Sequence, residues 1–298
     1  MKFSHKFSIA LIGVVAISAI AQPTAVVAIS AKVPSAAVAA GTKAEDFFIQ
    51  GNEKYQKGDY QAALAAYSQA IVLNPNYAEA YSNRGSVRSD LGDKQGAVAD
   101  YNQALRINPN YAQAYYNRGI SRSELGDKQG AVADYNQALR INPNYAKAYN
   151  NRGMVRSELG DNNGAVADYN QALRINPNFA EAYNNRGIYR YRLGDNKGAV
   201  AEYNQALRIN PNFAKPYLNR GVVRSDLGDK QGAVADYNQA LRINPNYAEA
   251  YGNRGFARSE LGNKQGAIQD FQKAADLFQK QGDKNNYEKA LNNVRRLR

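Results

Sequence analysis

Six prolines recur every 34 residues in this chain of 298 residues, at positions 75, 109, 143, 177, 211 and 245. The sequence between them recurs as well. Residues 115–143 read YYNRGISRSELGDKQGAVADYNQALRINP, and residues 149–177 read YNNRGMVRSELGDNNGAVADYNQALRINP. Self-similarity at a fixed period of about 20 to 50 residues indicates a solenoid, in which each unit buries its apolar face only against its neighbours. The period therefore predicts an extended contact surface rather than a closed catalytic pocket.

The period divides most of the chain into seven units, each expected to hold two helices. Their bounds are 44–77, 78–111, 112–145, 146–179, 180–213, 214–247 and 248–281. In the third unit, Gly126 can adopt the left-handed conformation that ends the first helix, and Asp127 can cap the second. Asn142 and Pro143 stop the second helix because a residue before proline avoids the helical region, and Asn144 is expected to cap the next unit.

The last residues, 282–298, are expected to form one further helix that caps the array. Tyr287, Leu291, Val294 and Leu297 share one stripe of this helix. A terminal unit needs a face that tolerates water, and a capping helix supplies it.

The repeated residues resemble the tetratricopeptide repeat (TPR) family over residues 44–281. The family pattern W-x2-L-G-x2-Y, A-x3-F, P is matched by Tyr115, Arg118, Gly119, Arg122, Ala131, Tyr135 and Pro143. The resemblance implies an all-α fold, a right-handed α-solenoid of seven helix-turn-helix units plus the C-terminal capping helix. The NRG, LGD and DYNQAL segments are also similar to those of bacterial arrays, including cyanobacterial ones.

Pairs of arginines depart from the family pattern, which has Leu and Tyr at these places. They are Arg84/Arg88, Arg118/Arg122, Arg152/Arg156, Arg186/Arg190, Arg220/Arg224 and Arg254/Arg258. An unpaired buried guanidinium costs several kcal/mol. Acidic residues recur in step with the pairs, namely Asp100, Asp134, Asp168, Glu202, Asp236 and Asp270. We therefore expect ion-paired seams along the array, with ligand-binding arginines as the alternative.

In the TPR family the first helices line a concave groove that holds an extended peptide or a partner helix. Carried over by position, this implies partner-binding asparagines at Asn83, Asn117, Asn151, Asn185, Asn219 and Asn253. An amide can hydrogen-bond a peptide backbone irrespective of its sequence; alternatively, asparagine is simply the usual family residue there. Three residues further on, an apolar stripe either contacts the partner or packs between repeats: Ile120, Met154, Ile188, Val222 and Phe256, with Ser86 at the first position.

The N-terminus resembles an export signal. Lys2 and Lys6 precede an apolar run, and Ala19-Ile20-Ala21 predicts cleavage before Gln22, which makes residues 1–21 a signal peptide. The alternative is a membrane anchor, but the run is shorter than the roughly 20 residues that a spanning helix needs. Residues 22–43 are expected to be a flexible spacer. An exported chain of this kind would be periplasmic, thylakoid-lumenal or extracellular, without a transmembrane anchor after cleavage.

Composition argues against catalysis. The chain has no cysteine, and its single histidine, His5, leaves with the predicted signal, so the mature chain lacks the commonest general base, a leading nucleophile and two major metal ligands. Cleavage also leaves 36 basic and 26 acidic residues, a formal net charge of +10. The basic residues are spread evenly, whereas a nucleic-acid channel would concentrate them among stacking aromatics, so no nucleic acid partner is expected.

The sequence thus predicts a non-enzymatic interaction scaffold with no cofactor or metal. Its partner would be a peptide or helix of another protein, held in the groove, and an assembly factor is one such role. The alternative is a structural or self-associating array that binds an anionic envelope polymer.

Overall fold

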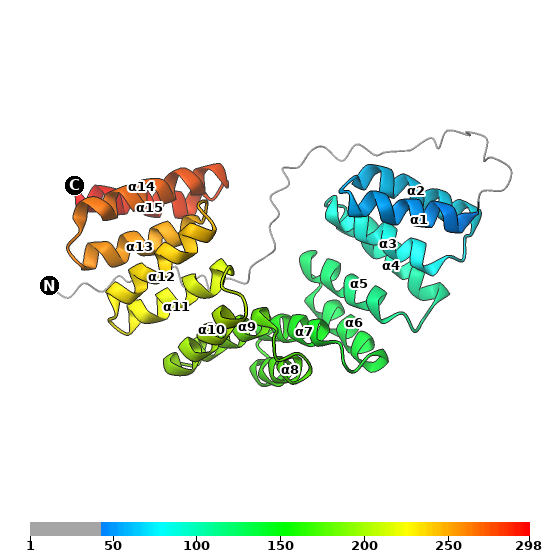
Figure 1. Cartoon of the computed structure of the whole chain (residues 1–298), viewed down its shortest axis with the longest axis horizontal. Coiled ribbons are helices and arrows are strands. Elements are labelled where there is room, and N and C mark those ends of the chain that lie inside the picture. The colour runs from blue at the N-terminus through cyan, green and yellow to red at the C-terminus, as the bar shows by residue number, and fades with distance from the viewer. Residues whose placement is uncertain (1–42) are drawn as a thin grey trace. The chain divides into compact units, whose positions relative to one another are not determined.

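The computed structural model describes residues 43–298, so the predicted signal peptide and all but the last residue of the predicted spacer lie outside the described residues. The described part contains fifteen α-helices and no strand (Figure 1). It forms two compact units, residues 43–165 and 166–298, whose boundary falls within helix α8. The prediction of an all-α array of helix pairs is confirmed.

The helices alternate between a first and a second helix of each pair. The first helices are α1 Ala44–Gln56, α3 Ala78–Asp90, α5 Ala112–Glu124, α7 Ala146–Glu158, α9 Ala180–Arg192, α11 Ala214–Asp226 and α13 Ala248–Glu260. The second helices are α2 Tyr60–Leu73, α4 Lys94–Ile107, α6 Lys128–Ile141, α8 Asn162–Ile175, α10 Asn196–Ile209, α12 Lys230–Ile243 and α14 Lys264–Lys280. A last helix, α15 Lys284–Leu297, follows them.

The Leu-Gly-Asp turn inside each pair has the geometry that the sequence predicts. Gly126 has a φ of 89°, which lets the chain turn without the steric cost that a Cβ would bring. Asp127 then caps α6 by accepting a hydrogen bond from the backbone N–H of Gly130 at 2.9 Å.

The expectation that Asn144 caps the next helix is wrong. Tyr145 is the N-cap of α7 and gives no side-chain bond, so Asn144 lies one residue too early to reach the free N–H groups of the helix. Asn142 stabilises the turn instead, because its Oδ1 accepts a hydrogen bond from the backbone N–H of Asn144 at 3.1 Å.

Small residues allow the two helices of a pair to cross closely. A Cβ added at Gly119 of α5 would lie 2.7 Å from Cε1 of Tyr135 on α6, so the tyrosine ring fills the place of a side chain. Ala131 and Ala138 of α6 are fully buried. The next pair covers this core, where Val155 of α7 packs against Ala131 and Tyr135.

Helix α1 ends the array on a polar face. In α3, Ala80 and Val87 are fully buried against α2, and the same register in α1 holds Asp46 and Glu53. Both acids are exposed. A preceding repeat would have to bury these two charges, so the chemistry of α1 suits a first repeat.

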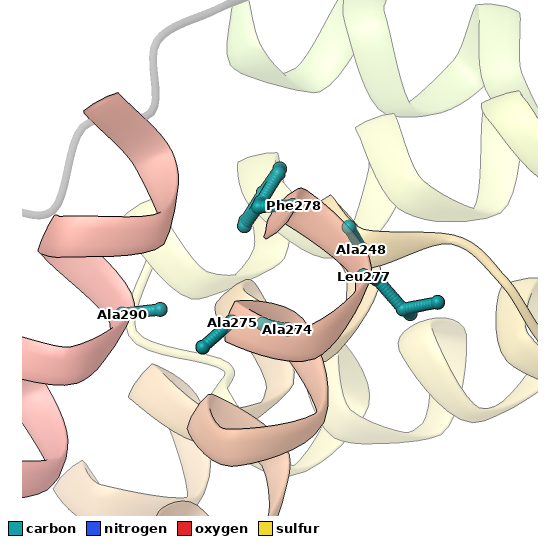
Figure 2. Close-up of a cluster of buried hydrophobic side chains, with 6 residues drawn as sticks. All are labelled: Ala248, Ala274, Ala275, Leu277, Phe278 and Ala290. Atoms are coloured by element: carbon teal, nitrogen blue, oxygen red, sulfur yellow. The ribbon is translucent and has the colours of Figure 1, made fainter. Parts of the chain in front are cut away.

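Helices α14 and α15 close the other end. Ala275 of α14 and Ala290 of α15 face one another in a cluster that also buries Leu277 and Phe278 (Figure 2). Tyr287 and Leu291 pack against this cluster, and Val294 and Leu297 pack with Phe271. The predicted capping stripe therefore contacts the last pair of helices.

Within each unit, the first helices lie on the inner side. Neighbouring first helices contact one another (α3 with α5, α5 with α7, α9 with α11, and α11 with α13). Among the described residues no contact of similar extent joins neighbouring second helices, either in α2, α4 and α6 or in α10, α12 and α14. The first helices are therefore closer together and form the inner surface of each unit.

Candidate functional site

The predicted arginine seam is present. Arg118 of α5 forms a two-bond fork with Asp134 of α6, with Nε to Oδ2 at 2.9 Å and Nη2 to Oδ1 at 2.5 Å. Arg122 adds a bond to the same carboxylate at 2.9 Å. Equivalent ion pairs join the arginines of other repeats to Asp100, Glu202, Asp236 and Asp270. In the fourth repeat Arg156 pairs with Asp161.

The first arginine of each pair also binds the preceding repeat, a contact that the sequence did not reveal. Arg118 Nη1 donates to Asn102 of α4 at 2.6 Å, and its guanidinium lies 5.3 Å from the centre of the Tyr115 ring. The same asparagine contact recurs at Arg152, Arg186, Arg220 and Arg254, with partners Asn136, Asn170, Asn204 and Asn238. The recurring Asp-Tyr-Asn triplet was the signal for it.

The seam is a structural element rather than an open ligand site. The Arg118 side chain is 14% exposed and that of Asp134 is 3% exposed. Their hydrogen-bonding groups face one another and neighbouring helices, which leaves little of them for a ligand.

In the N-terminal unit, the predicted partner-binding asparagines bridge consecutive first helices. Asn83 donates to Oδ1 of Asn52 at 3.0 Å, and Asn117 donates to Oγ of Ser86 at 3.3 Å. Asn151 donates to the hydroxyl of Tyr116 at 3.1 Å. All three are half-buried, and each amide keeps a second N–H for another acceptor.

In the C-terminal unit, the same series is interrupted at its last member. Asn219 donates to Oδ1 of Asn184 at 2.9 Å, and Asn185 accepts from Nδ2 of Asn184 at 3.3 Å. The side chain of Asn253 has no hydrogen bond to any residue of 43–298. At the matching places in the preceding repeat stand Leu218 and Val222, neither of which has a side-chain acceptor.

Open space adjoins this unbonded amide. Gly252 is buried, yet a Cβ built on it would meet nothing within 4 Å. Corresponding positions in the other repeats hold larger side chains: Ser82, Tyr116, Asn150, Asn184 and Leu218. Gly252 thus leaves room for a side chain that this chain does not supply.

The predicted apolar stripe is half-buried throughout. Ile120, Ile188, Val222 and Phe256 each pack against the core between repeats, and Met154 and Ser86 are half-buried in the same register. One side of the stripe therefore serves packing, while the remaining exposed side lies beside the asparagines.

Charged residues one turn before the asparagines complete the inner surface of the C-terminal unit. Burial lowers the pKa of Lys215, and the nearby charge of Glu181 opposes this shift. Glu249 lies four residues before Asn253, on the same face of α13, and forms no ion pair within residues 43–298.

Sequence reasoning singled out neither Glu249 nor Gly252. One feature of the sequence could have indicated this place: the residue before each repeated asparagine varies between copies, while the asparagine does not.

No metal centre or membrane span is found in the described residues. Residues 43–298 hold no group of three or more His, Cys, Asp or Glu side chains that could bind a metal ion. None of the helices in this range is long and apolar enough to cross a bilayer.

Comparison with known families identifies the repeat. The TPR repeat profile matches residues 51–92, 87–126, 155–194, 189–228 and 223–262. Further tetratricopeptide repeat profiles match residues 112–145, 134–167 and 248–281. The helix pairs and these matches define an α-helical repeat protein of the interaction-scaffold class. The chain belongs to the tetratricopeptide repeat family, whose members are typically non-catalytic scaffolds.

Solved structures share the fold. A tetratricopeptide repeat protein from Parabacteroides merdae is 23% identical, with a TM-score of 0.66 over 85% of this chain and 98% of that chain. MamA is 28% identical, with a TM-score of 0.50 over 55% of this chain and 96% of its own. PilW, a type IV pilus biogenesis factor, is 23% identical, with a TM-score of 0.63 over 70% and 96%. No curated protein matches the chain significantly.

Proposed function

We propose that this protein is a non-catalytic adaptor that holds a peptide or helix of a partner protein on the inner surface of its first helices. One observation supports the proposal most. In the C-terminal unit, the unbonded amide of Asn253 lies next to the open space at Gly252 and to the half-buried Phe256. The amide nitrogen and oxygen of Asn253 are not fully buried, so they can exchange water for the polar groups of a peptide backbone.

The surroundings indicate what such a segment would carry. Leu218, Val222 and Phe256 provide an apolar wall, and the space at Gly252 accommodates an apolar side chain. Glu249 offers a carboxylate without a cationic partner among residues 43–298. A segment with an apolar residue next to a lysine or arginine complements both features.

Selection from a phage library of random short peptides tests the proposal. The selected peptides are expected to combine an apolar with a basic residue. Asn253→Ala and Gly252→Met should each weaken the tightest peptide by about tenfold, because one removes the amide and the other fills the space.

Ala65→Met is the matched control. It places the same side chain on an exposed position of α2 and should leave the affinity unchanged. If every selected peptide binds wild type and the Gly252→Met variant equally well, the proposed surface is wrong.

We further propose that the protein works outside the cytoplasm, in the periplasm, the thylakoid lumen or the medium. The charged, apolar and small-residue order of residues 1–21 supports this. Cell fractionation with N-terminal sequencing tests it, and the expected mature terminus is Gln22. A full-length chain recovered from the cytoplasmic fraction would contradict export.

A further inference from the structure

The basic residues fall into two groups, those that form an ion pair with an acidic residue and those that do not. Residues 43–298 contain 35 basic and 26 acidic residues, since only Lys2, Lys6 and Lys32 lie before them. The first-helix arginines face the carboxylates of the seam. Lys94, Lys128 and Lys230 pair with Glu124, Glu158 and Glu260 of the following first helix. The excess positive charge must therefore lie elsewhere.

A second series of arginines carries part of that excess. It occupies the last turn of five second helices and consists of Arg106, Arg140, Arg174, Arg208 and Arg242. All five are exposed, and none forms an ion pair with any residue of 43–298. Arg174 and Arg242 donate only to neighbouring glutamines, Gln171 and Gln239.

The exposed stripe that leads to each of these arginines contains no acid. On α4 it consists of Gln95, Ala99, Asn102 and Arg106, and α6 and α12 repeat the same four residue types. On α10, Lys197 replaces the glutamine and adds another positive charge. The outer faces of these helices therefore present cations without local neutralisation.

The series stops at both ends of the array. Val72 of α2 and Asp276 of α14 occupy the register of these arginines. A cation in the last turn of any helix gains from the helix dipole. The longer helix α14 does have Lys280 in its last turn, but α2 has no basic residue there, so the dipole alone does not account for the series.

We propose that two surfaces, the outer faces of α4 and α6 within residues 43–165 and those of α8, α10 and α12 within residues 166–298, each bind a linear polymer of anionic groups that carries no aromatic bases. The planar guanidinium binds phosphate and carboxylate oxygens through two parallel bonds. The intervening alanine and asparagine side chains are short and allow a polymer backbone to approach. Single-stranded nucleic acid fits less well, because the stripes contain no aromatic side chain for a base to stack on.

The test compares two variants from which the same charge has been removed. One changes the five arginines to glutamine. The other changes five exposed lysines outside the stripes to glutamine: Lys57, Lys264, Lys273, Lys280 and Lys284. All ten positions are exposed, so both variants should fold, and circular dichroism checks this.

The probes are long-chain inorganic polyphosphate, polygalacturonate as the carboxylate source, and oligo-dT as the nucleic acid. Polyphosphate or polygalacturonate should bind wild type with a steep salt dependence. The arginine variant should lose about tenfold or more in affinity and show a flatter salt dependence, while the lysine variant changes less than about threefold. The stronger of the two probes identifies phosphate or carboxylate as the preferred group.

Equal losses of affinity in both variants would mean that binding depends only on the net charge of the protein, which would overturn the proposal. So would oligo-dT binding as tight as that of the two base-free polymers, or no binding of either of them.

Discussion

Arg118 and Asp134 are joined by two parallel hydrogen bonds across the helices of one repeat, and the same carboxylate also accepts a bond from Arg122. Asp134 is 2% exposed, so its charge depends on these two guanidiniums for compensation. The pair also extends beyond its own repeat, because Arg118 donates to Asn102 of the preceding one. One acid thus indirectly fixes both the crossing of two helices and the contact between neighbouring repeats.

Removing that charge should destabilise the N-terminal unit. In Asp134→Asn, Arg118 remains half-buried without a counter-ion, while Arg122 keeps only its longer pair with the exposed Asp127 at 3.6 Å. We expect the free energy of unfolding to fall by about 3 to 5 kcal/mol. Urea unfolding followed by circular dichroism measures it. Asp276→Asn, at an exposed position of α14 without an ion pair among residues 43–298, is the control and should change it by less than about 0.5 kcal/mol. Similar losses in the two variants would contradict a structural role for the seam.

The same added methyl group should have opposite effects at two helical glycines. Gly119→Ala places a Cβ 2.7 Å from the buried ring of Tyr135, and we expect a loss of about 1 to 3 kcal/mol. Gly252→Ala meets nothing within 4 Å, so the higher helix propensity of alanine should stabilise the protein by about 0.5 to 1 kcal/mol. Urea midpoints measure both. Destabilisation by Gly252→Ala would mean that the space beside Asn253 is not open.

The repeat made much of this fold predictable. The acids recur in step with the arginine pairs, so the seam could be inferred from charge and spacing alone. The turn glycine and the capping aspartate follow from local backbone chemistry at Gly126 and Asp127. These inferences depend on residues within one repeat, or on a series that keeps the same residue type in every copy.

The state of Asn253 could not be inferred in the same way. Whether a repeated asparagine is bonded depends on the residues 31 or 35 positions earlier, such as Ser86 for Asn117 and Asn184 for Asn219. Both positions are used, since Asn83 bonds to Asn52, 31 residues earlier, and Asn151 bonds to Tyr116, 35 residues earlier. The asparagine is the same in every copy, so the residue itself does not indicate that one copy lacks a hydrogen-bond partner.

High pH should unfold the protein through its buried tyrosines. Burial raises the pKa of Tyr116 to about 12, although its hydrogen bond with Asn151 opposes the shift. Burial raises the pKa of Tyr135, Tyr203 and Tyr237 as well. An unfolded tyrosine has a pKa of about 10, so the folded state keeps these protons to higher pH. Their contribution to stability is complete below about pH 10 and is lost as the pH rises toward the folded pKa, about 12 for Tyr116.

Urea unfolding at a series of pH values, with tyrosinate absorbance recorded in parallel, measures this loss. Tyr116→Phe should make the decline above pH 10 shallower, because one of the linked protons is gone. Val72→Ala, an exposed change that removes no ionisable group, serves as the control and should leave the slope of the decline as it is in wild type. A free energy of unfolding that stays constant up to about pH 11 would refute the linkage.

Deleting residues 283–298 should expose an apolar surface at the C-terminal end of the array. Phe278 is 2% exposed and shares a cluster with Ala290 of α15 (Figure 2). Val294 of the same helix packs against Phe271. Loss of the helix uncovers a continuous apolar patch, and each large side chain returned to water costs about 1.5 to 3 kcal/mol.

We expect a lower urea midpoint, increased binding of an apolar dye and concentration-dependent self-association by light scattering. Deleting only Arg298, which is exposed, is the control and should change none of the three. A monomeric deletion variant with the wild-type midpoint would show that α14 can end the array by itself.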